Sequence, residues 1–444
     1  MKSEKLRQQA LDLIYKFFVN SNDFNGIPLR DISEKLSIEY EDSIDLIKQL
    51  ITDGSVFLQS STNPHIIGRL NNIPIETQIK IIDDAKSTEV KHEPIGNIVI
   101  SVEQTEFPIC LYPSPSYLTQ NRSFDEFSGA KFTTLLANAE PQLSFRFFET
   151  DVLEKYSNDP RFNFKFTDFY GDIYCAYDED GNPLLREEDQ VFLKSFGLGF
   201  DKDDNRLICV LLRDLSDLSP EHQMHWSSKE IPVKECKVLK EYAENVIEGC
   251  WITTRSIFSA FIGEINAIYA LTKNIYNKPL FKKEYSGENW PQNFTFFFSP
   301  TAKNYYDFVN LLDKYLSENL EKNFFTDTIE PFELKDIGDG LVERINKGSL
   351  KLLEEWLNKS IKFQDDNAVS ALMKPLKKVR KERQKPAHAI ITNTYDVKFI
   401  DKQKSLIEEC YHTLYNLRKL FQSHPKCKGI EIPDWLDAGN IKVY

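Results

Sequence analysis

An arginine and a histidine that lie close together in the sequence are the residues best suited to chemistry. Arg383 and His388 are separated by four residues, one of which is Pro386. Histidine titrates near neutral pH and can take a proton from a hydroxyl group, whereas arginine stays charged and can bind phosphate oxygens through paired hydrogen bonds. RNA cleavage needs these two properties: a base for the 2′-OH proton and a cation for the charge that develops on phosphate.

These two residues end the most basic stretch of the chain, KPLKKVRKERQKPAH at positions 374–388. Seven Lys or Arg residues and one Glu give the stretch a charge of +6, in a chain of 444 residues whose net charge is −13. A local stripe of positive charge, rather than total charge, indicates a nucleic-acid surface. The residues expected to hold the RNA backbone are Lys377, Lys378, Arg380, Lys381, Gln384 and Lys385.

Pro386 decides how the arginine and the histidine can meet. On a straight α-helix, five residues correspond to about 500°, so the side chains of Arg383 and His388 would point about 140° apart. A proline disfavours helical geometry in the residue before it and removes a helical hydrogen bond. We therefore expect the helix to break at Lys385, so that His388 can turn back toward Arg383 or toward a second copy across a two-fold axis.

The composition is that of a folded protein with several domains. Hydrophobic residues make up 41% of the chain, and its length predicts two or three domains. The seven cysteines are scattered and form no CxxC pair, which argues against disulfide frameworks and cysteine zinc sites and favours a reducing cytoplasm. We find no apolar run of 18 residues, so no segment is expected to span a membrane.

Residues 1–70 are expected to form three helices followed by a β-hairpin, with VFLQSS (56–61) and IIGRL (66–70) as its strands. This order resembles a winged helix-turn-helix domain. In DNA-binding members the third helix enters the major groove. Here that helix carries Glu41, Asp42 and Asp45 against Lys48, so phosphates would be repelled. We therefore expect a protein-contact or dimerisation role for this domain rather than DNA reading.

A different pattern follows after a polar linker with a short helix at 71–94. Ile98, Ile100 and Val102 alternate with polar residues, which predicts a strand, and LICVLLRDL (207–215) predicts a central strand. Residues 95–235 are thus expected to form a mixed α+β domain of unknown role. Within it, His222 and His225 have the spacing of a metal site on a helix, but a packed corner is the favoured interpretation.

From residue 236 to residue 444 the sequence is mainly helical. A 3.6-residue apolar period runs from Val238 to Ile265, and helices are expected at about 305–319, 334–362, 367–385 and 401–424. Helices with short connections pack as a bundle. We therefore expect the basic stretch to end a helix inside a helical bundle.

The bundle resembles the HEPN superfamily of helical domains. RQKPAH fits the pattern of an arginine, four to six residues and a histidine that marks this superfamily, and Gln384 matches the polar residue that commonly follows the arginine. The resemblance covers about 334–424, or the wider span 236–444. It implies a metal-independent endoribonuclease without cofactors, which works as a homodimer with both motifs facing one cleft. Arg383 and His388 would be catalytic, and the products would carry a 2′,3′-cyclic phosphate and a 5′-OH.

Taken together, we expect a multidomain, mainly α protein. Its parts are a winged-helix-like unit, a central mixed α+β domain and a C-terminal HEPN-like helical bundle. The resemblance also implies a regulated toxin or antiviral-defence effector, restrained by a sensor or autoinhibitor within 1–235, where the N-terminal domain could also bind a protein partner. The alternatives are a non-catalytic HEPN interaction module and a winged-helix transcriptional regulator.

Overall fold

The chain forms two compact units of mixed α and β structure. In the computed structural model 51% of the residues are helical and 17% lie in strands. The first unit comprises Met1–Val152, Asp159–Asn163 and Asp172–Val238, and the second comprises Leu153–Asn158, Phe164–Gly171 and Leu239–Tyr444. The structure describes residues 2–68, 73–86, 90–95, 98–103, 108–291, 294–338, 341–388 and 392–444.

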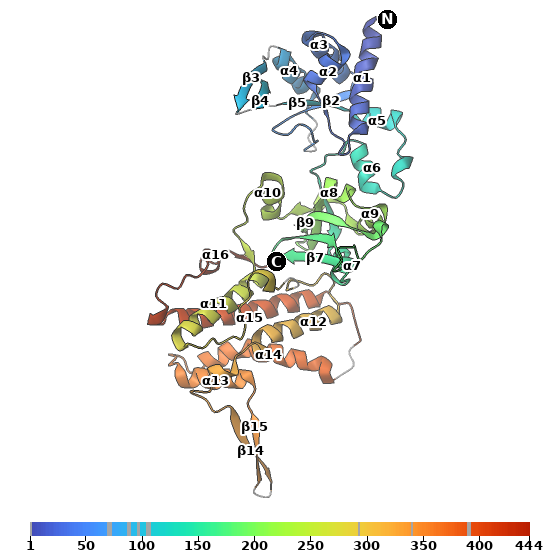
Figure 1. Ribbon diagram of the computed structural model, residues 1–444. Coiled ribbons are helices and arrows are strands. Elements are labelled where there is room, and N and C mark those ends of the chain that lie inside the picture. The colour runs from blue at the N-terminus through green and yellow to red at the C-terminus, as the bar shows by residue number, and fades with distance from the viewer. Residues whose placement is uncertain are drawn as a thin grey trace. The chain divides into compact units, whose positions relative to one another are not determined.

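The N-terminal part of the first unit combines helices with a three-stranded antiparallel sheet (Figure 1). Its sheet has the order β1-β5-β2, with Ile27 opposite Leu111 and Leu58 also opposite Leu111. The elements are α1 (Lys2–Asn20), β1 (Ile27–Pro28), α2 (Leu29–Leu36), α3 (Tyr40–Thr52), β2 (Val56–Ser60), α4 (Ile75–Lys86), the antiparallel pair β3 (Val90–Ile95) and β4 (Ile98–Glu103), and β5 (Ile109–Pro113).

The predicted pairing of VFLQSS with IIGRL is wrong. The described partner of β2 is β5, which arrives about fifty residues later in the sequence. Residues 66–68 form no strand, while Arg69 and Leu70 lie outside the described residues. All five residues of β5 are buried, as expected of a strand with a neighbour on each side and helices above it. The predicted strand at Ile98–Val102 is confirmed as β4.

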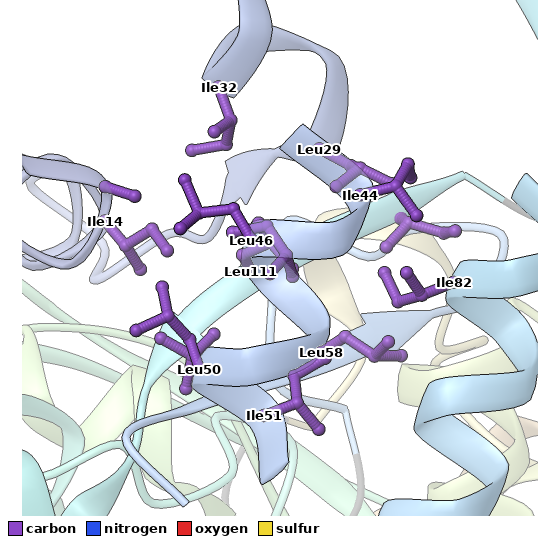
Figure 2. Packing of buried hydrophobic residues seen from close by; sticks show 14 of the residues in the cluster. Ile14, Leu29, Ile32, Ile44, Leu46, Leu50, Ile51, Leu58, Ile82 and Leu111 are labelled. Atoms are coloured by element: carbon purple, nitrogen blue, oxygen red, sulfur yellow. The ribbon is translucent and has the colours of Figure 1, made fainter. Parts of the chain in front are cut away.

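An apolar core joins these helices to the sheet (Figure 2). The apolar residues of α3 recur at helical spacing, so that one face of the helix is buried. Leu58 of β2 and Leu111 of β5 meet this face from the sheet, and Ile82 of α4 closes the cluster. The side chains labelled in Figure 2 are Ile14, Leu29, Ile32, Ile44, Leu46, Leu50, Ile51, Leu58, Ile82 and Leu111.

The central region is built around a seven-stranded sheet with the order β11-β6-β10-β9-β8-β7, in which β12 also pairs with β9. The central strand expected at 207–215 is confirmed in its first part as β10, which is nearly all buried and lies between β6 and β9, whereas residues 212–215 belong to a helix. The strands are β6 (Phe145–Glu149), β7 (Phe162–Thr167), β8 (Tyr170–Cys175), β9 (Phe192–Phe200), β10 (Arg206–Leu211), β11 (Glu230–Ile231) and β12 (Lys237–Val238). The accompanying helices are α5 (Pro115–Asn121), α6 (Lys131–Ala137), α7 (Glu154–Ser157), α8 (Leu212–Ser216) and α9 (Pro220–Ser227).

The second unit is a helical assembly in which α11 packs against α15, while α12 and α13 pack against α14 (Figure 1). The apolar period of 238–265 is divided between two helices, because Gly249 ends the first one in a left-handed conformation. The helices are α10 (Lys240–Glu248), α11 (Ile257–Tyr276), α12 (Ala302–Asp313), α13 (Ser349–Ser360), α14 (Ala368–His388), α15 (Lys398–Gln422) and α16 (Asp434–Asp437). The terminal strand β16 (Ile441–Lys442) pairs in parallel with β13 (Arg255–Ser256).

The predicted helix at 334–362 is wrong in its first half. Residues there form an antiparallel hairpin, β14 (Phe332–Gly338) and β15 (Leu341–Asn346), and only α13 is helical. The sequence Gly338-Asp339-Gly340, which connects the two strands, is typical of hairpins. Figure 1 shows the hairpin extending away from the helices, and Leu334, Leu341 and Val342 are 65%, 62% and 60% exposed.

Among the described residues, every helix is too short or too polar to cross a lipid bilayer. This finding rests on helix length and hydropathy together. The longest helix, α15, has 25 residues, but charged side chains recur along it.

We predict that Leu111→Ala weakens the N-terminal core. Leu111 is fully buried, so truncation should cost about 2–5 kcal/mol of unfolding free energy through lost contacts and the cavity left behind. Native-state hydrogen exchange at the amides of β2 and β5 measures this change. The matched control is Leu341→Ala, whose exposed side chain should matter by less than about 0.5 kcal/mol. Equal effects of the two variants would contradict the packing described.

Candidate functional site

All eight residues predicted for the RNA site lie on α14, which runs from Ala368 to His388. The prediction that Pro386 breaks this helix at Lys385 is wrong, because the helix continues through Pro386 and ends at His388. Proline at this position removes the hydrogen bond to the carbonyl of Glu382 and crowds that carbonyl with its ring, and the helix ends two residues later. Pro375 is accommodated within the same helix.

The continuous helix changes the expected relation between Arg383 and His388. On a straight α-helix, positions 383 and 388 lie about 140° apart around the axis. The helix break that the sequence predicted before Pro386, which would have let His388 turn back toward Arg383, is therefore absent. The side chain of His388 lies outside the described residues, so its contacts remain a prediction.

A buried carboxylate holds the arginine of the motif. Asp313, at the end of α12, has a side chain only 1% exposed. One of its oxygens, Oδ2, accepts hydrogen bonds from Nη1 of Arg380 at 2.7 Å and from Nη1 of Arg383. Its other oxygen, Oδ1, accepts the hydroxyl of Ser317 at 2.5 Å. Two arginines from one face of α14 thus meet a single desolvated acid on α12.

A short π-helical turn makes this arrangement possible. It spans Lys314–Glu318 and directly continues α12. Because a π-helix has i→i+5 hydrogen bonds, it widens the turn and keeps residues four and five positions apart on one side. Ser317 and Glu318 therefore face the same way as Asp313, and Glu318 contacts Nη1 of Arg383 as well.

The electrostatics of Arg383 follow from these contacts. Hydrogen bonding to Asp313 is the largest influence and raises the pKa of Arg383 above its ordinary value, with Glu318 adding to the effect. The guanidinium is therefore charged at every accessible pH and is fixed at Nη1. Its Nε and Nη2 groups take no part in these contacts and remain able to donate hydrogen bonds.

Most other basic residues of α14 are also paired with acids. Lys377 contacts Glu354 of α13 at 2.7 Å, and Lys378 contacts Glu409 of α15 at 2.8 Å. Lys385 contacts its neighbour Glu382 at 2.6 Å, one turn earlier on the same helix. Lys381 and Gln384 are exposed, and no ion pair joins Lys381 to another described residue.

These contacts give the basic stretch a role in helix packing that its sequence does not reveal. Its cations bind acids on three neighbouring helices and so link α14 to α12, α13 and α15. The acidic partners were missed because they lie between 23 and 70 residues away in the sequence. No local pattern marks such pairs, although acidic residues in the neighbouring helices are a prerequisite for them.

The two histidines of α9 serve the fold of the first unit. The ring nitrogen Nε2 of His222 donates to the carbonyl of Asp189, and that of His225 donates to the carbonyl of Val152, both at 2.9 Å. The two rings thus bind carbonyls on different segments, as in a packed corner. Across the described residues, no group of three or more His, Cys, Asp or Glu side chains is arranged to hold a metal ion.

We predict that Asp313→Asn destabilises the second unit. Replacing the carboxylate with an amide places N–H groups against two guanidinium groups, and hydrogen bonds to charged partners contribute about 1.5–3 kcal/mol each. Urea unfolding, with amide exchange in α12 and α14 to localise the loss, measures the change.

The control for this variant is Glu318→Gln. Glu318 contacts the same arginine but is 44% exposed, so its removal should cost less than about 1 kcal/mol. If Asp313→Asn proves no more damaging than Glu318→Gln, the buried carboxylate does not anchor α14.

Comparison with models of protein families, with curated proteins and with solved structures finds no match to this chain.

Proposed function

We propose that the chain is a metal-independent endoribonuclease of HEPN type, with Arg383 and His388 as its catalytic residues. The observation that carries this proposal is the RQKPAH sequence at the end of a helix, with the motif's arginine held by a buried acid. An arginine fixed through one nitrogen can present its remaining donors to a phosphate without losing its orientation. His388 would take the proton of the 2′-OH, and the 2′ oxygen would attack the adjacent phosphorus while the bond from phosphorus to the 5′ oxygen breaks. The 5′ oxygen would leave with a proton, so that the products are a 2′,3′-cyclic phosphate and a 5′-OH.

The proposal requires a second copy of the chain. Positions 383 and 388 of a straight helix lie about 140° apart around its axis, so a cleft between two copies, in which one copy's histidine approaches the other's arginine, would supply the needed geometry. Lys381 and Gln384 are exposed and would contact the RNA backbone first. Lys377, Lys378, Arg380 and Lys385 would reach phosphate only by exchanging their present acidic partners.

The N-terminal region fits a role as partner surface or regulator within this proposal. Three helices and a sheet of order β1-β5-β2 support the winged-helix resemblance, whereas the strands that the sequence predicted for its wing do not pair with each other. Helix α3 offers Glu41, Asp42 and Asp45, while Lys48 already pairs with Asp83 at 2.5 Å. Such a face would bind protein rather than duplex DNA. A regulated toxin or defence effector in the cytoplasm is the setting that the HEPN resemblance implies.

A second candidate function is a non-catalytic HEPN interaction module. It is favoured by the ion pairs of Lys377, Lys378, Arg380, Arg383 and Lys385, which bind the basic stretch to its own bundle. In this case the arginine and the lysines would stabilise the helical packing. The chain would then bind a partner stably and leave RNA uncut.

We predict that His388→Ala reduces RNA cleavage by about 10²–10⁴-fold, the range expected when a general base is lost. The measurement is gel analysis of RNA incubated with purified full-length protein in EDTA, with the ends of the products identified as 2′,3′-cyclic phosphate and 5′-OH. Arg383→Ala should show a loss of similar size.

The matched control for the cleavage assay is His412→Ala, which removes an exposed histidine of α15 in the same unit. It should cleave as the unaltered protein does. Equal cleavage by the unaltered protein and by His388→Ala would assign the activity to a contaminant and reject the proposal. Absence of cleavage together with a stable protein complex would favour the interaction module.

A further inference from the structure

The hairpin of β14 and β15 presents a strand edge that no other described strand covers. The two strands form a sheet of their own, which Figure 1 shows extending away from the helices of the second unit. A strand edge carries a row of backbone N–H and C=O groups with which another chain can pair. An isolated two-stranded hairpin is only marginally stable in water, so an added strand would stabilise it.

The base of the hairpin is fixed to the neighbouring helix. Glu333 of β14 forms an ion pair with Lys351 of α13, and hydrogen bonding from Lys351 lowers the pKa of Glu333. Arg344 of β15 stacks over the ring of Phe332, with 3.3 Å between the guanidinium carbon and the ring centroid. The strands are therefore held in place before any partner arrives, which lowers the entropic cost of adding a strand.

One face of the hairpin is apolar next to the edge of β14. Leu334 is 65% exposed and Val342 is 60% exposed. In the observed register Leu334 lies opposite Arg344, and Asp336 lies opposite Val342. Leu334 and Val342 are thus diagonal neighbours on the same face, close enough to form one apolar surface.

The charge of the hairpin favours a protein partner over a nucleic acid. Between Phe332 and Asn346 the sequence contains two cations, Lys335 and Arg344, and four acids. Phosphates would therefore be repelled by this element. A protein strand, in contrast, can place opposite charges against both signs.

The sequence of β14 is complementary to itself. Its pairing with β15 is regular from Phe332 to Asp336 and shifts register between Asp336 and Gly338, so Leu334 is the centre of the regular part. In antiparallel pairing about this centre, Leu334 would lie opposite Leu334 of a second copy. Glu333 of each copy would lie opposite Lys335 of the other, so both charged pairs would be attractive.

The edge of β15 is less suited to pairing with its own copy. Its two middle residues are Glu343 and Arg344. A two-fold axis at either residue would place like charges directly opposite each other, which is unfavourable. Self-complementarity is therefore a property of β14 and distinguishes it from the other edge of the same hairpin.

We propose that two copies of this chain associate through β14. The two β14 strands pair antiparallel about Leu334 and join the two-stranded hairpins into one four-stranded sheet. Leu334 and Val342 of both copies then form one apolar surface across the two-fold axis. The contact does not rest on the proposed ribonuclease activity, since none of its residues belongs to α14.

A disulfide across the two-fold axis tests this contact. Residues opposite each other on antiparallel strands have Cα atoms about 4.5–5.5 Å apart, a distance that a disulfide spans. Full-length Leu334→Cys, treated with oxidised glutathione, should therefore form a linked dimer in which mass spectrometry identifies the 334–334 bond. The matched control is Leu341→Cys, which is similarly exposed but lies away from the axis. A yield no higher for Leu334→Cys than for this control would overturn the proposal.

Charge reversals in the Leu334→Cys protein test the register. Glu333→Lys or Lys335→Glu alone places like charges opposite each other twice in the dimer, so the 334–334 disulfide should form at least about 5-fold less. A mixture of the two variants restores both attractive pairs, and the disulfide between them should recover, which also shows that both hairpins remain folded. A mixture that forms no more of the disulfide than its separate components would contradict the proposed pairing.

A catalytic variant separates this contact from the ribonuclease proposal. His388→Ala in the Leu334→Cys protein should form the 334–334 disulfide as fully as Leu334→Cys alone. A failed cleavage test then leaves the β14 contact standing. Loss of the disulfide in this variant would contradict a contact made by β14 alone.

Discussion

The arrangement of α12 and α14 depends on the burial of one carboxylate. Asp313 has lost its contact with water, and three donors from two helices replace that hydration. Because a buried charge needs its partners in place, the face of α14 that carries Arg380 and Arg383 must be directed at α12. This requirement sets the rotation of α14 about its axis, and with it the direction of every other residue of the basic stretch. The burial of Asp313 thus determines both how α14 packs against α12 and which way the basic residues of the proposed site point.

A second buried pair has a comparable role between α11 and α15. Arg418 of α15 and Glu264 of α11 are 2.6 Å apart, and both side chains are fully buried. Burial raises the pKa of Glu264 even though Arg418 opposes the effect. Arg418 also contacts Asp437 at 2.9 Å, which ties the C-terminal helix α16 to the same pair. Charged groups therefore specify the contacts among helices whose apolar faces alone would permit several registers.

The sequence predicted features that depend on nearby residues, and it missed features that depend on residues far apart in the chain. Helices α12, α14 and α15 were predicted well because their apolar periods are long and local. The hairpin β14–β15 was missed because Ile337, Leu341 and Ile345 recur every four residues, a spacing that a helix also shows. Arg383 was found from its motif, but its acceptor is 70 residues away, and such a pairing leaves no local trace.

The π-helical turn after α12 has a consequence for how this bundle can vary in evolution. A π-turn accommodates one residue more than a regular helical turn, so losing a residue within Lys314–Glu318 would restore a regular α-helix. In the shortened helix the residues now at 317 and 318 would stand three and four positions after Asp313, and these positions still lie on its face of a regular α-helix. The wider turn therefore absorbs one additional residue while the serine and the second acid stay beside the buried carboxylate. This turn is a place where the chain can lose one residue and keep the side chains that hold the arginine on one side of the helix.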